Sequence, residues 1–84
     1  MEYNEAWAVD ISRIERFFLS LENAEALGEG MIRCGNCSVK LTPLSGHPVG
    51  PVEVPRTKVE ISGADEDAKK LYRRFFLRFI SAGG

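Results

Sequence analysis

The sequence predicts a two-layer α+β sandwich, in which a small antiparallel sheet of about three strands is packed by an N-terminal and a C-terminal amphipathic helix. Two observations support this fold class. Apolar residues follow helical spacing near both ends of the chain, and the segment between them alternates like strands and is broken by glycine and proline. With 84 residues, the chain is predicted to form a single domain over residues 1–84.

The first helix is predicted from its apolar spacing and from its end signals. Apolar residues stand at positions 11, 14, 17, 18 and 21, which places them on one helical face. Ser12 and Glu15 have the spacing of a capping box, so we expect the helix to begin there and to end at Gly28 and Gly30. Residues 5–11 fit either a short strand or an extension of this helix, and both alternatives stay open.

A change of apolar parity marks the first turn of the sheet. Ile32 and Cys34 share one parity, while Cys37 and the apolar residues after it share the other. The change falls at Gly35-Asn36, a glycine-first pair typical of a type II′ hairpin turn. The pattern therefore predicts a hairpin that pairs residues 31–34 with residues 37–42, or alternatively one long strand with a bulge at Gly35.

Proline and glycine then interrupt the sheet pattern. Residues 43–51 hold three prolines and two glycines, and we predict that they form a loop. Strand character resumes over residues 52–61, where Pro55 indicates an edge position or a strand that begins only near Arg56.

The last helix has the longest periodic pattern in the chain. Its predicted core stripe follows i, i+3, i+4 spacing over three turns and consists of Ala68, Leu71, Tyr72, Phe75, Phe76, Phe79 and Ile80. Residues 81–84 are predicted to be a flexible tail.

Composition restricts the classes of function. The formal net charge is −1, so the whole molecule has no strong attraction for polyanions. The longest wholly apolar run is residues 6–9, far short of the roughly 20 residues of a membrane-spanning helix, and no membrane partner is expected. Two cysteines without a signal peptide predict a cytoplasmic protein with reduced thiols.

The two cysteines are the candidate metal or thiol site. Cys34-Gly35-Asn36-Cys37 has the CxxC spacing of a zinc knuckle, in which a hairpin tip directs two thiolates at one tetrahedral ion. A structural zinc ion needs four ligands. Either His47 and a carboxylate of the same chain, or the two thiolates of a second copy of the chain, would complete the site. The alternative is that no cofactor binds and that both thiols are inert.

The C-terminal helix carries the candidate partner-binding surface. Its outer face gathers four basic side chains, Lys70, Arg73, Arg74 and Arg78, around Leu77, which lies off the apolar stripe. Such a face suits an acidic partner helix or a phosphate backbone. The predicted order of one helix, three strands and one helix is similar to that of double-stranded-RNA-binding domains, which implies nucleic acid as an alternative partner. However, this helix begins with three acidic residues where those domains place lysines.

The function predicted from the sequence is that of a non-enzymatic interaction module. It binds a protein partner or itself, as a homodimer, through the basic helix face or a sheet edge. A single histidine and the absence of any nucleophile motif give no support for catalysis. A zinc or thiol protein and a nucleic-acid-binding domain are the two alternatives.

Overall fold

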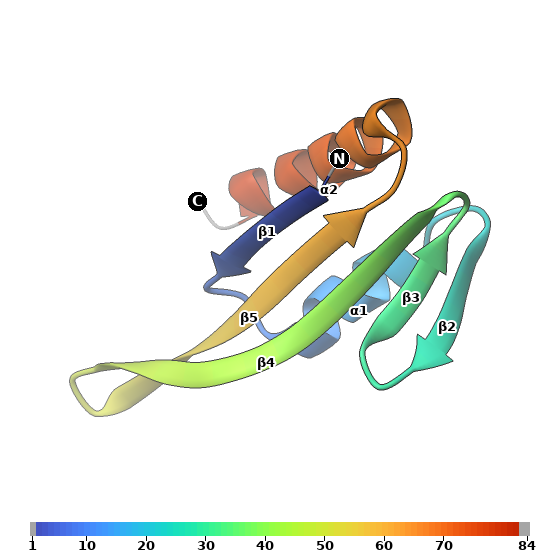
Figure 1. Cartoon of the computed structure of the whole chain (residues 1–84). Coiled ribbons are helices and arrows are strands. Elements are labelled where there is room, and N and C mark those ends of the chain that lie inside the picture. Colours follow the sequence, from blue (N-terminus) through green and yellow to red (C-terminus); the bar gives the residue numbers. More distant parts are fainter. Residues whose placement is uncertain (1, 83–84) are drawn as a thin grey trace.

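A computed structural model describes residues 2–82, apart from the side chains at positions 47, 81 and 82. Along the chain the elements are β1 (Glu2–Trp7), α1 (Ile11–Leu19), β2 (Ala24–Gly28), β3 (Met31–Cys34), β4 (Cys37–Val49), β5 (Val52–Ser62) and α2 (Asp65–Ala82) (Figure 1). The protein is therefore an α+β protein. Of the predicted tail, residues 81 and 82 belong to α2, and residues 83–84 lie outside the described part.

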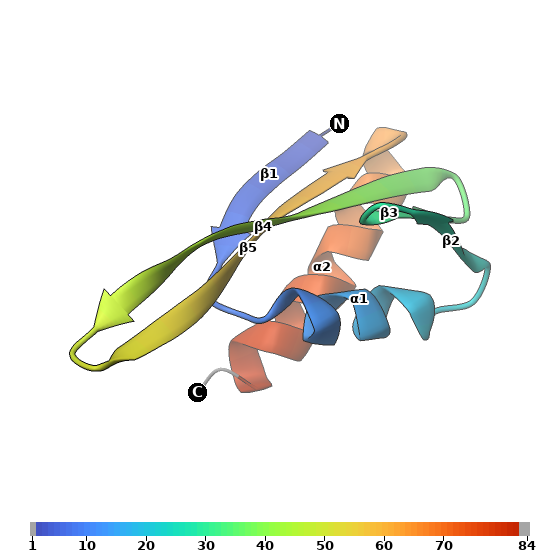
Figure 2. The ribbon, with the colours of Figure 1, turned by 90° about the horizontal axis from the view of Figure 1, so that it is seen from below.

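The sheet is larger than predicted, and the predicted fold class was wrong on this point. It contains five strands instead of about three, all antiparallel to their neighbours, in the order β1-β5-β4-β3-β2. The strands β1 and β2 form the two edges of the sheet. They are joined through α1, and both helices lie on the same face of the sheet (Figure 2).

The two additional strands come from segments whose local pattern is weak. Of residues 5–11, for which both strand and helix were predicted as alternatives, residues 5–7 belong to β1, residues 8–10 form the connection, and Ile11 begins α1. Residues 24–27 are good helix formers, yet the segment Ala24–Gly28 forms β2 because its backbone pairs with β3. The helix α1 consequently ends at Leu19 rather than at Gly28. Its N-cap is Asp10, so the predicted capping box at Ser12 was wrong, and the Ser12 hydroxyl instead donates to the Asp10 carboxylate.

The predicted hairpin at Gly35-Asn36 is confirmed. Cys34 and Cys37 are paired directly across the turn, and Gly35 has a φ of 60°, a value that a type II′ turn requires at its first central position. The hairpin also explains the change of parity, because reversing the chain brings Ile32 and Val39 to the same face of the sheet.

A second glycine is needed at the β2–β3 connection. Gly30 has a φ of 80°, and a Cβ atom there would lie 2.4 Å from the carbonyl oxygen of Leu41.

Residues 43–51 differ from the predicted loop, because most of them belong to β4. The strands β4 and β5 pair as far as Val49 and Val52, which flank a Gly50-Pro51 turn. Residues 44–56 therefore form a two-stranded β-arm that runs beyond the ends of β1 and β3 (Figure 1). Prolines are tolerated in the arm because a strand with a free edge needs no amide hydrogen there.

The core lies between the sheet and the two helices. It is made by residues of α1, α2, β3, β4 and β5, and its largest fully buried side chains are Phe18, Phe75, Ile14, Ile32, Ile61, Val39 and Thr57. The buried polar residue Thr57 donates its hydroxyl to the carbonyl oxygen of Val9 at 2.8 Å, which ties the start of α1 to β5. The opposite face of the sheet carries polar residues such as Lys58 and Glu60, which form an ion pair at 2.9 Å.

Within residues 2–82, neither helix is both long enough and apolar enough to cross a membrane.

Candidate functional site

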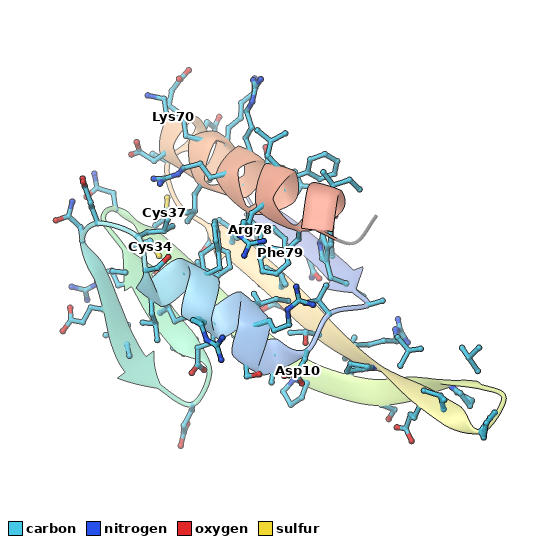
Figure 3. All side chains as sticks on the ribbon, turned by 180° about the vertical axis from the view of Figure 1, so that it is seen from behind. Asp10, Cys34, Cys37, Lys70, Arg78 and Phe79 are labelled. Atoms are coloured by element: carbon cyan, nitrogen blue, oxygen red, sulfur yellow. The ribbon has the colours of Figure 1, made fainter. Side chains whose placement is uncertain are left out.

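The five predicted partner-binding residues on α2 do not form one surface. At 100° per residue they spread over about 140° of the helix circumference. Arg73 and Leu77 lie on the outer face. Lys70 and Arg74 line a cleft that also holds the two cysteines, and Arg78 lines a different cleft against α1. Figure 3 shows Lys70 and Arg78 projecting from α2 in different directions.

The cysteines lie in a cleft of about 260 Å³ between the β3–β4 turn and the first half of α2. Both thiols are free. Cys34 is half-buried, and its Sγ atom lies 4.0 Å from the carbonyl oxygen of Phe18 as a weak hydrogen-bond donor. Cys37 is buried, with 3% of its surface exposed. Asp67 closes one side of the cleft, next to Lys70.

Both thiols hold their protons more tightly than an ordinary cysteine does. Burial raises the pKa of Cys34, and the neighbouring Cys37 adds to the effect. Burial also raises the pKa of Cys37, with the Asp67 carboxylate acting in the same direction. Because the thiolate is the nucleophile and the metal ligand, this environment opposes both roles at neutral pH.

The predicted metal ligands are not brought together. His47 lies in the β-arm, ten residues along β4 from Cys37, which corresponds to about 33 Å of strand. Among the described side chains, no three His, Cys, Asp or Glu residues converge on a position that could hold a metal ion. Cys34 and Cys37 flank the β3–β4 turn, where Cys37 belongs to the core and Cys34 packs against it.

The clearest exposed apolar surface lies where α2 passes beside β1. Within α2, Phe76, Leu77 and Ile80 keep 37%, 54% and 51% of their surface exposed. Around the helix, Phe76 and Ile80 follow Tyr72 on the flank that faces β1. The indole ring of Trp7, from β1, contacts the Phe76 ring edge-on at a centroid distance of 5.9 Å.

The strand β1 forms the other half of this surface. One side of it pairs with β5, and within the described residues no strand pairs with its other side. Tyr3 of β1 stacks on Tyr72 of α2, with ring centroids 4.1 Å apart and planes inclined by 4°. The Tyr72 hydroxyl donates to the Glu5 carboxylate at 2.6 Å. Burial, followed by this hydrogen bond and the charge of Glu5, raises the pKa of Tyr72 to about 12.

We call this region the edge surface and define it as the free side of β1 together with Lys69, Arg73, Phe76, Leu77 and Ile80 of α2. Phe76 and Ile80 were predicted to belong to the core stripe of α2, but both side chains are partly exposed. The apolar positions of this stripe span about 180° of the helix, wider than contact with one sheet requires. That width was the signal in the sequence that part of the stripe remains exposed.

No protein-family model matches the chain, and no significant match is found among curated proteins.

Proposed function

We propose that the protein is a small non-enzymatic interaction module whose first partner is a second copy of itself, bound through the edge surface. The supporting observation is that a free strand edge and an exposed apolar helix face lie side by side. A free edge offers backbone donors and acceptors that a second strand can satisfy. The neighbouring apolar side chains supply the burial that backbone pairing alone does not provide.

A two-fold axis perpendicular to the sheet fits both features at once. Antiparallel pairing of β1 with its copy gives one continuous sheet and keeps all four helices on the same face. The outer faces of the two α2 helices then approach each other. A standard interface takes about 800 Å² from each partner, roughly one seventh of the 5563 Å² accessible surface of the chain. The strand edge and the helix face must therefore both contribute.

Charge also favours a second copy as the partner. On the face of the sheet that carries α2, the edge surface has the acidic Glu5 of β1 and the basic Lys69 and Arg73 of α2. Across the two-fold axis, Glu5 of one copy can form an ion pair with Lys69 or Arg73 of the other, beside the apolar residues. In this proposal the dimer works in the cytoplasm, where both thiols remain reduced.

Sedimentation equilibrium of three single variants tests the proposal. Leu77→Glu places a charge in the apolar part of the interface, and Arg73→Glu reverses a charge in its basic part, so both variants are expected to weaken the dimer. Arg56→Glu, on the exposed β-arm, is the matched control and should associate like the wild type. Circular dichroism confirms that each variant is folded. If wild type and all variants have the same mass at every concentration, the proposal is refuted.

A further inference from the structure

A second cleft lies between α1 and α2, on the flank of α2 that faces away from β1. It has a volume of about 240 Å³ and is lined by Arg13, Arg16, Phe17, Ser20, Arg78 and Phe79. Figure 3 shows Arg78 and Phe79 extending from α2 toward α1. The Phe17 and Phe79 rings meet at a centroid distance of 5.6 Å and form the floor of the cleft.

Three arginine side chains therefore line one small cleft. The cation of Arg78 lies 5.7 Å from the centroid of the Phe79 ring, which orients it along the aromatic floor. Within residues 2–82, none of the three arginines has a carboxylate at ion-pair distance, and the ion pair present is Lys58 with Glu60. Three like charges held close together without a counter-charge repel one another, and a bound anion relieves this repulsion.

The surroundings do not supply the missing negative charge. Glu15, the acidic residue of α1, lines a neighbouring cleft beside Arg16, but among the described residues it forms no ion pair with any of the three arginines. The hydroxyl of Ser20 donates to the carbonyl oxygen of Phe17 at 2.6 Å. The C-terminal end of α1 contributes about half a negative charge through its dipole, far less than three full positive charges.

The geometry points to an oxyanion site, and we propose that this cleft binds a phosphate group held by Arg13, Arg16 and Arg78. Guanidinium groups match phosphate oxygens in pairs and keep their charge at every physiological pH. The volume accommodates a phosphate ion, or a phosphate borne on a group of about one ring that contacts Phe17. This site is separate from the edge surface and does not depend on the proposed dimer.

NMR titration of the full chain at low ionic strength tests this site with two probes, inorganic phosphate and phenyl phosphate. We expect saturable shifts of backbone amides over residues 13–20 and 76–80 with at least one probe. Similar dissociation constants for the two probes would assign the site to free phosphate. Binding of phenyl phosphate that is about tenfold tighter would assign it to a phosphate borne on a small ligand.

Arginine variants separate a built site from diffuse attraction. Arg78→Gln removes a charge-assisted contact and should weaken binding about tenfold or more, whereas Arg56→Gln, on the exposed β-arm, should leave binding unchanged. If Arg78→Gln does not fold, Arg13→Gln on the exposed side of α1 tests the same contact. Shifts that do not saturate with either probe, or equal weakening by Arg56→Gln and the cleft variants, would overturn the proposal.

Discussion

Replacing Ile80 by serine measures how much the exposed part of α2 contributes to self-association. Burying an entire isoleucine side chain is worth about 1.5–3 kcal/mol. Ile80 keeps 51% of its surface exposed in the single chain, so burying the remainder in a dimer is worth about 1 kcal/mol. A two-fold interface contains the residue twice, so the two Ile80 side chains together contribute about 2 kcal/mol to the free energy of dimerisation. Ile80→Ser should therefore raise the dimer dissociation constant about 30-fold.

The assay is sedimentation equilibrium over a concentration range that spans the wild-type dissociation constant. Val52→Ser is the matched control because Val52 is an aliphatic residue with 61% exposure on the β-arm, away from the edge surface. It should leave the dissociation constant unchanged. Thermal unfolding followed by circular dichroism checks that both variants are folded. The reasoning is refuted if Ile80→Ser dimerises like the wild type, or if Val52→Ser weakens association to the same extent.

Three further predictions concern the fold and its titrating groups. Gly30→Ala should strongly lower the thermal midpoint, because its Cβ atom would lie 2.4 Å from the Leu41 carbonyl oxygen at a φ of 80°; an unchanged midpoint would contradict the β2–β3 geometry. Tyr72 should ionise only near pH 12, seen as a late rise in tyrosinate absorbance that Tyr72→Phe removes. Since this pKa exceeds its unfolded value of about 10, the stability that Tyr72 contributes is present below pH 10 and is lost as the pH rises through 12. Iodoacetamide should modify Cys34 before the more buried Cys37, and at neutral pH more slowly than it modifies a free cysteine; a fast reaction at pH 7 would show that Cys34 is activated.

The parts of the fold that were predictable are those with strong local signals. The C-terminal helix has three turns of regular apolar spacing, and the structure has α2 over the same residues. The Gly35-Asn36 hairpin was predictable because a glycine-first turn and a change of apolar parity coincide at one position. In both cases the local preference agrees with the contacts that the segment makes in the fold.

The missed strands depend on pairing between distant parts of the chain. The segment that forms β2 has helix-forming residues, and only its pairing with β3 makes it a strand. The β-arm contains prolines that argue against a strand, and it is possible only because its outer edges are free. Neither the pairing of β2 with β3 nor the free edges of the β-arm can be recognised from the local sequence.

The candidate sites were predictable in residue type but not in grouping. The basic residues of α2 were recognised, but their division between two clefts depends on where α1 crosses the sheet. Arg13 and Arg16 are separated from Arg78 by more than sixty positions, so their approach is visible only in the folded chain. The cysteine pair has the spacing of metal ligands. Its burial, however, depends on packing against the core, and its distance from His47 depends on the length of β4.

Hydrogen exchange of the β1 backbone amides, measured at low and high protein concentration, tests the central claim most directly. In the proposed dimer, the amides on the free side of β1 become hydrogen-bonded to the second copy. Their protection should therefore increase with concentration, while amides of the β-arm should exchange at the same rate throughout. Equal exchange rates for β1 at both concentrations, over a range in which the mass doubles, would place the interface elsewhere and contradict the account.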